Sequence, residues 1–156
     1  MKDENLIQYV NGSIELIDFV GPLWTKLNHH HKNNSKHFSE RYERNTFEER
    51  KKGLLEKAKD GKMKIFLCKD IKNNIDIGYC ISTVDNKNVG EIDSLYVEPE
   101  YRKLGIGDAL MNQGLAWLEH NKVSTITIGV ASGNEKAFGF YEKYGFYPKA
   151  TILSRK

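Results

Sequence analysis

The sequence predicts one domain of the mixed α/β class, in which helices flank a mixed β-sheet. The length of 156 residues fits a single domain. No internal repeat or Pro/Gly-rich linker divides it, so residues 1–156 are expected to fold together. The predicted elements run β-α-α-β-β-β-α-β-α-β, an antiparallel meander followed by a strand–helix–strand unit that implies a parallel pair.

Residues 1–60 are predicted to supply the first strand and two helices. Residues 6–10 read as a short strand, and apolar residues recur at helical spacing from 14 to 28. Pro22 falls inside this pattern and is expected to kink or divide the helix. The polar, aperiodic segment 29–45 is typical of a loop or a frayed helix end.

A second helix is predicted from Thr46 to about Lys59. Thr46 is a suitable N-cap because Glu49 follows three residues later, and Gly61 closes the helix.

Residues 61–156 are predicted to form the core of the sheet. Helices are expected over 105–120 and from Asn134 to Tyr144, with Gly145 as the left-handed residue after the second. Five runs of β-forming residues predict strands: 63–68, 75–84, 91–97, 123–130 and 146–153.

Bulk properties favour a cytoplasmic protein without nucleic-acid or membrane partners. The 24 basic and 21 acidic residues leave a net charge of only +3. No apolar run resembles a signal peptide or a membrane span. Cys68 and Cys80 are expected to be buried reduced thiols. The triplet 29–31 consists of histidines, which cannot share one ion on a helix, so no metal is expected.

The segment 101–107, Tyr-Arg-Lys-Leu-Gly-Ile-Gly, carries the strongest chemical pattern and lies between a predicted strand and a helix. Glycines allow close backbone approach, and the first amides of a helix have no intrahelical partner. Arg102 and Lys103 add two cations, so the segment predicts an anion site that suits a diphosphate. A dinucleotide fingerprint fails at Leu110, and a P-loop fails at Asp108.

Two blocks resemble the GNAT superfamily of N-acetyltransferases. Arg102-x-x-Gly105-x-Gly107 is similar to the family's phosphate loop, and the segment 134–146 is similar to its second block, Asn-x-x-Ala-x-x-Phe-Tyr-x-x-x-Gly-Phe. The resemblance is strong over residues 91–148. It implies a GNAT fold with a mixed sheet of six to seven strands, splayed between the fourth and fifth strands, and about four helices.

The resemblance also implies an acetyl-CoA site without a metal. A bulge in the fourth strand would open a cleft, and an irregularity near 95–97 would place Ile92 and Leu95 on one face of the strand. Pantetheine would pair with that strand. Asp108 departs from the family pattern and is expected to face away from the phosphates. The cofactor residues implied are Leu95, Tyr96, Val97, Arg102, Lys103, Leu104, Gly105, Ile106, Gly107, Asp108, Asn134 and Tyr141.

Amine acetylation needs a base for the ammonium and a proton donor for the leaving thiolate. Tyr141 matches the family's tyrosine and is expected to be the general acid. Glu91 and Asp93 lie two residues apart on one strand face and are the candidate bases, with Asp93 slightly preferred. Backbone amides near Leu95 would polarise the thioester.

Residues 1–60 would wall the acceptor side, where Trp24, His31, Phe38 and Tyr42 are candidate contacts. A small-molecule or peptide amine is the expected acceptor, and a homodimer is one expected assembly. The main hypothesis is therefore an acetyl-CoA-dependent N-acetyltransferase. The alternatives are a catalytically silent GNAT-fold module that senses acyl-CoA, and an unrelated α/β binding protein.

Overall fold

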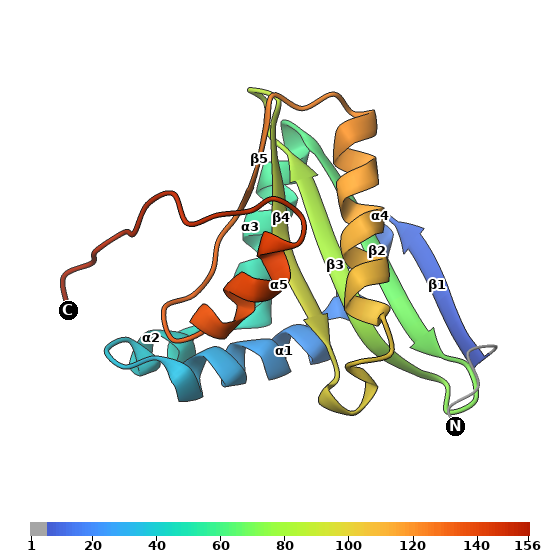
Figure 1. The fold of residues 1–156 in the computed structure, drawn as a ribbon, viewed down its shortest axis with the longest axis horizontal. Helices are drawn as coiled ribbons and strands as arrows, with labels where there is room; N and C mark the ends of the chain where they lie inside the picture. The colour runs from blue at the N-terminus through green and yellow to red at the C-terminus, as the bar shows by residue number, and fades with distance from the viewer. Residues whose placement is uncertain (1–5) are drawn as a thin grey trace.

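The computed structural model describes residues 6–156 and confirms the mixed α/β class (Figure 1). Five strands lie side by side in chain order, with β1 to β4 antiparallel and β5 parallel to β4. The meander and the final parallel pair are therefore as predicted. The strands are β1 (Ile7–Gly12), β2 (Lys62–Asp70), β3 (Ile75–Val84), β4 (Val89–Val97) and β5 (Thr125–Ile128).

The sheet has fewer strands than the six to seven expected, and the predicted last strand over 146–153 is wrong. This segment pairs with no strand of the described chain and runs away from the sheet (Figure 1). Ile152 and Leu153 are 94% and 91% exposed. A strand depends on a ladder partner, and β-forming side chains alone do not supply one.

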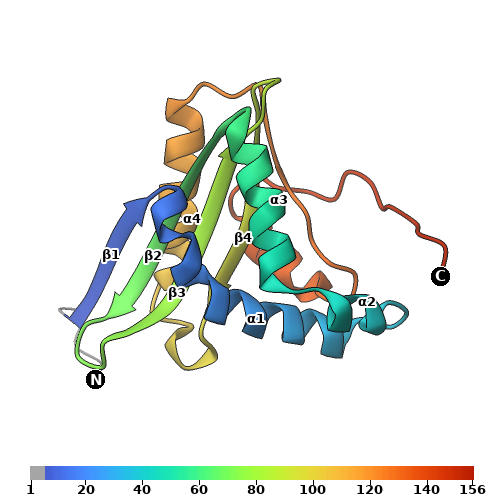
Figure 2. The ribbon, with the colours of Figure 1, turned by 180° about the vertical axis from the view of Figure 1, so that it is seen from behind.

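Helices cover both faces of the sheet (Figures 1 and 2). One face packs against α4 (Ile106–His120), whose Leu110, Met111 and Leu118 are fully buried. The other face packs against α1 (Ile17–Asn34) and α3 (Phe47–Lys59). Burying each large apolar side chain contributes about 1.5–3 kcal/mol. The short helices are η2 (Ile14–Leu16), α2 (Ser39–Arg44), η3 (Pro99–Tyr101), η4 (Glu135–Ala137) and α5 (Phe138–Glu142).

The predicted start of α3 is confirmed. The Thr46 hydroxyl oxygen accepts a hydrogen bond from the Glu49 amide at 3.2 Å, which satisfies one free amide of the first turn. Gly61 lies just beyond the helix, where a Cβ would come within 2.0 Å of the Val84 carbonyl oxygen. The turn into β2 therefore requires glycine.

Helix α1 runs unbroken past Pro22 and extends further than predicted. Of the two effects expected of Pro22, a kink or a division, the division does not occur, because the missing amide costs one hydrogen bond while Val20 and Leu23 are buried against the sheet. The helix also continues to Asn34, into the segment predicted as a loop, and α2 follows. None of the helices in residues 6–156 is long and apolar enough to cross a membrane.

The two cysteines are free and buried, as predicted. Burial is the main cause that raises the pKa of the Cys68 thiol to about 11 and that of Cys80 to about 12. Both thiols stay protonated at neutral pH, so they act as small apolar core residues.

Candidate active site

The central feature of the site is the separation of β4 from β5. β5 pairs only with residues Val89–Ile92, so residues 93–97 of β4 have no strand partner on that side within residues 6–156. Opposite β3, Ile81 faces Ser94 and Ser82 faces Ile92, which leaves Asp93 as the extra residue of a bulge. The irregularity is thus earlier than the predicted 95–97, although it still places Ile92 and Leu95 against the same core cluster.

Two cavities meet along this unpaired part of β4. The loop cavity, of about 360 Å³, lies between the end of β4, the segment 102–108 and α5. The α1 cavity, of about 250 Å³, lies between α1, α2, the middle of β4 and the segment after β5. Both cavities are lined by Leu27, Leu95, Asn134 and Tyr141. The two cavities are therefore adjacent at these four residues.

The loop cavity brings together ten of the twelve predicted cofactor residues. The two exceptions are Leu104, which is 51% exposed, and Ile106, which is 2% exposed in the core beneath α4. Two residues that neighbour the glycines in the sequence therefore do not line the cavity.

The loop itself is shaped to hold an anion. Gly105 has a φ of 78° as the N-cap of α4, which favours glycine. A Cβ on Gly107 would lie 3.6 Å from the Phe140 ring, so packing within the protein does not require glycine there. Gly107 instead borders the cavity, where a side chain would fill ligand space. The free amides of the first turn of α4 suit a phosphate.

Arg102 is held in place beside this loop. Its Nε donates to the Val97 carbonyl oxygen at 2.9 Å, and its guanidinium lies 5.6 Å from the centre of the Tyr96 ring. Both contacts fix a positive charge at the end of β4, where it lines the loop cavity.

Asp108 borders the loop cavity, and its charge is neutralised within the protein. Its carboxylate accepts hydrogen bonds from the Tyr144 hydroxyl and from Lys143 Nζ, the latter at 2.9 Å. These two donors, Tyr144 first, hold the pKa of Asp108 below its usual value. Asp108 was expected to face away from the phosphates, whereas it borders the loop cavity, and pairing with the two residues that follow α5 offsets its repulsion of an anion there.

Tyr141 lies on the wall that both cavities share. Its ring packs edge-on against Phe140 at 5.4 Å, and its hydroxyl makes no hydrogen bond with any residue of the described chain. Burial, followed by the nearby Cys80, raises its pKa to about 12, so the hydroxyl keeps its proton at pH 7.

Asn134 directly precedes the short helix η4, as predicted, but its side chain makes no capping hydrogen bond to that helix. η4 and α5 end at Glu142, short of the predicted Tyr144, while Gly145 has the expected left-handed φ of 86°. The Asn134 side-chain oxygen lies 3.4 Å from His30 Nε2. Its position on both cavity walls leaves the amide available to a ligand.

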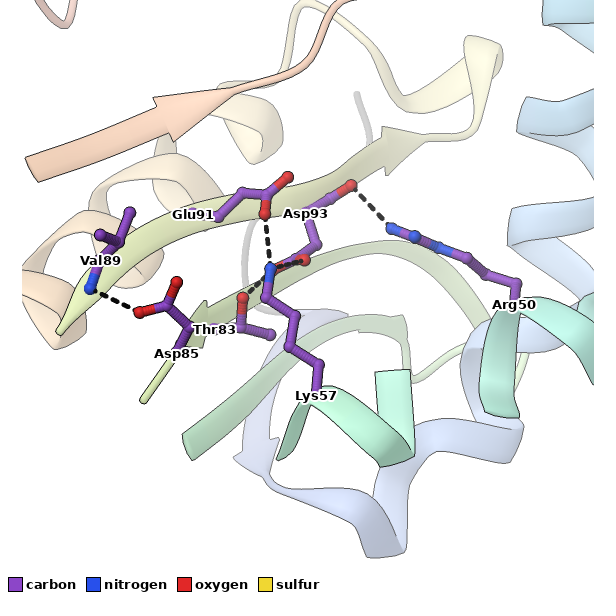
Figure 3. A network of polar contacts seen from close by, with 7 residues as sticks. All are labelled: Arg50, Lys57, Thr83, Asp85, Val89, Glu91 and Asp93. Atoms are coloured by element: carbon purple, nitrogen blue, oxygen red, sulfur yellow. Dashed lines mark hydrogen bonds and ion pairs between the residues drawn. The ribbon is translucent and has the colours of Figure 1, made fainter. Parts of the chain in front are cut away.

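Glu91 and Asp93 share one strand face and both bind Lys57 of α3 (Figure 3). Lys57 Nζ lies 2.5 Å from Glu91 and 2.9 Å from Asp93, whose second oxygen accepts a hydrogen bond from Thr83 at 2.6 Å. The Asp93 side chain is 3% exposed, and burial is the main cause that raises its pKa. Asp93 lines the α1 cavity, whereas Glu91 lines neither cavity.

The α1 cavity collects three of the four predicted acceptor contacts, namely Trp24, His31 and Tyr42, but not Phe38. The Nδ1 atom of His31 is buried without a hydrogen-bond partner among the described residues. Burial lowers the pKa of His31, so its imidazole is neutral at pH 7. No group of three or more metal-binding side chains occurs in residues 6–156.

The cavity also contains a residue that sequence analysis missed. Arg50 of α3 lines the α1 cavity and donates to the Asp93 carbonyl oxygen at 3.1 Å. The two residues are 43 positions apart, and no spacing pattern in the sequence links them.

Comparison with known proteins places the chain in a family. Residues 25–146 match the model of the acetyltransferase (GNAT) family. An uncharacterized N-acetyltransferase of Methanocaldococcus jannaschii is 28% identical over 105 residues, which cover 65% of this chain and 45% of that protein. A mycothiol acetyltransferase of Acidimicrobium ferrooxidans is 31% identical over 74 residues, covering 45% of this chain and 24% of that protein. The chain thus matches less than half the length of these curated relatives.

Solved structures support the fold. A GCN5-related N-acetyltransferase from Ralstonia eutropha superposes with a TM-score of 0.73 at 16% identity, covering 96% of this chain and 98% of that one. A structure of AAC(6')-Iy with a CoA-containing bisubstrate analogue gives a TM-score of 0.64 at 14% identity, covering 96% and 97%. The match of residues 25–146 to the family model, in a chain with the splayed strands and the glycine loop, shows that the chain belongs to the acetyltransferase (GNAT) family.

Proposed function

We propose that the chain transfers an acetyl group from acetyl-CoA to a primary amine by direct attack on the thioester. The observation that carries the proposal is the meeting of two cavities at Leu95 and Tyr141. One cavity has the anion-binding loop, and the other has aromatic and polar side chains suited to a small molecule. We further propose that the reaction takes place in the cytoplasm and that the acceptor is a small-molecule or peptide amine.

Acetyl-CoA would lie in the loop cavity. The diphosphate would contact the first turn of α4, with Arg102 and Lys103 beside it. The pantetheine would run along residues 93–97 of β4, whose edge has no strand partner on the β5 side. The thioester would then lie near Leu95, at the junction with the α1 cavity.

In the reaction, the amine nitrogen attacks the thioester carbonyl carbon, so that an N–C bond forms and the C–S bond breaks. The amine proton passes to a base, and the leaving sulfur is stabilised by the Tyr141 hydroxyl, which is neutral at pH 7. Backbone amides of β4 near Leu95 would stabilise the negative charge on the carbonyl oxygen.

Two groups compete for the role of base. Asp93, with Glu91 beside it, has a raised pKa that favours proton uptake, but both Asp93 oxygens already bind Thr83 and Lys57. His31 lines the same cavity as Asp93 and has a buried nitrogen without a partner among the described residues. Its lowered pKa keeps the lone pair free at pH 7, which favours it as the second candidate.

Thiol release from acetyl-CoA across a mixed panel of amines tests the proposal. We expect release that depends on the added amine, because only an amine in the α1 cavity can accept the acetyl group. A melting temperature raised by acetyl-CoA together with no release on any amine would instead support the silent sensor. No shift and no release would contradict both hypotheses.

A further inference from the structure

The charge of the α1 cavity restricts its ligand. Among residues 6–156, the side chains that line it include one guanidinium, Arg50, and one carboxylate, Asp93, and burial lowers the pKa of His31, so that its imidazole is neutral at pH 7. The Asp93 carboxylate binds Lys57 and Thr83, so neither oxygen is free for a ligand. The cavity therefore offers an incoming molecule one cation and no free anion.

Arg50 is not paired with an acid. It is half-buried, and its one hydrogen bond within residues 6–156 is the donation from its terminal nitrogen to the Asp93 carbonyl oxygen. No carboxylate of the described chain lies within ion-pair distance of it, because Glu91 and Asp93 both turn toward Lys57 (Figure 3). A guanidinium has five N–H donors in a planar fork, so most of its capacity is unused.

We infer that the acceptor is a small amine that also carries a carboxylate, and that Arg50 binds this carboxylate. The inference rests on the proposed acetyl transfer and names its substrate class. A carboxylate at Arg50 would replace the water that otherwise accepts hydrogen bonds from the half-buried guanidinium. The planar guanidinium can donate two parallel N–H bonds to the two oxygens of one carboxylate. Arg50 would thereby orient the amine toward the thioester.

The dimensions of the cavity agree with such a molecule. Arg50 is anchored at the carbonyl of Asp93, two residues before Leu95, and two strand residues span about 6–7 Å. An amine and a carboxylate only a few bonds apart fit between these points. The volume of about 250 Å³ is below the roughly 300–1,000 Å³ of typical drug-sized sites. Trp24 and Tyr42 supply apolar surface for the rest of the acceptor.

The same features disfavour polycationic acceptors. One structural neighbour is an aminoglycoside acetyltransferase from an uncultured soil sample, and aminoglycosides carry multiple ammonium groups. Recognition of such a substrate requires carboxylates that are free to pair with it. In the α1 cavity the only carboxylate is neutralised by Lys57, and Arg50 would repel an ammonium group.

The test compares acceptors that differ only in the carboxylate. We would measure kcat/KM for a set of amino acids, for the carboxamide of each, and for short peptides that begin with an acidic residue. The enzymes would be the wild type, Arg50→Gln, Arg50→Lys and, as matched control, Lys52→Gln on the exposed side of the same helix.

We expect at least one amino acid to exceed its carboxamide by about 10–100-fold, the range of one charge-assisted pair. Arg50→Gln should reduce this ratio toward one through a higher KM, Arg50→Lys should retain part of it, and Lys52→Gln should leave it unchanged. Equal use of acids and carboxamides by the wild type would overturn the inference and leave the proposed function standing. Faster acetylation of the peptides would overturn the small-molecule acceptor, and silence on every amine would overturn the proposed function itself.

Discussion

Replacing Lys57 with methionine should destabilise the protein in a pH-dependent way. Lys57 bridges two carboxylates, and the Asp93 side chain is only 3% exposed (Figure 3). Removing the cation leaves a buried carboxylate with the Thr83 hydroxyl as its remaining side-chain donor. Breaking a buried pair by removing one partner costs 3–5 kcal/mol. Because Lys57 itself is 28% exposed, we expect a smaller loss of about 2–3 kcal/mol in the free energy of unfolding near pH 7.

The sign of the pH dependence follows from Asp93. Its pKa in the folded protein is already raised by burial, and loss of Lys57 should raise it further. Between its ordinary pKa of about 3.9 and the higher folded pKa, the native state binds more protons than the unfolded state. The stability of the variant should therefore recover as the pH falls through the folded pKa, and the penalty should be greatest above it.

Urea unfolding of both proteins at about pH 7 and about pH 5 measures this difference. Lys51→Met is the matched control, because Lys51 pairs with Asp18, which is 74% exposed, and its loss should change little. The double variant Lys57→Met/Asp93→Asn should regain most of the loss, since the unpaired charge is gone. A Lys57→Met protein as stable as the control at both pH values would refute the reasoning.

Four further predictions concern the loop, the helix cap and the two candidate bases. Gly107→Ala should leave the melting temperature unchanged or higher, since the added Cβ meets Phe140 at 3.6 Å, while acetyl-CoA affinity measured by calorimetry falls about tenfold or more. Unchanged affinity would remove Gly107 from the site. Thr46→Ala should lower the free energy of unfolding by about 1 kcal/mol in urea without altering acetyl transfer; an unaltered midpoint would count against the cap. Asp93→Asn should lower the rate more at pH 7 than at pH 9 if Asp93 is the base, and an unchanged pH profile would exclude it. His31→Gln should remove the fall in rate at acid pH if His31 is the base, and retention of that limb would exclude His31.

Local patterns in the sequence were sufficient for much of the fold. The cap at Thr46, the left-handed Gly145 and the strand Ile75–Val84 agree with the prediction because each is determined within a few residues. The glycine loop was found for the same reason. The strand over 146–153 was wrong because strand formation depends on a distant partner, which this segment lacks in the described chain.

The parts of the site that sequence analysis missed depend on contacts between distant elements. Lys57 and Arg50 come from α3 and reach β4 across 34 to 43 residues. Nothing in their spacing distinguishes them from the other charged residues of an amphipathic helix. The two carboxylates were predicted to share a face, but their pairing with Lys57, which changes their chemical role, required the packing of α3 on the sheet.

Acetyl transfer is proposed to take place where the two cavities meet, beside Leu95 and Tyr141. The most direct measurement quantifies free CoA thiol and acetylated amine in one reaction, for the wild type and for Tyr141→Phe, on the best acceptor of the panel. We predict equal amounts of both products, with a turnover reduced about 100-fold or more in the variant at unchanged acetyl-CoA affinity. Thiol release without acetylated amine would exclude acetyl transfer to the amine, and full activity of Tyr141→Phe would exclude Tyr141 as the proton donor.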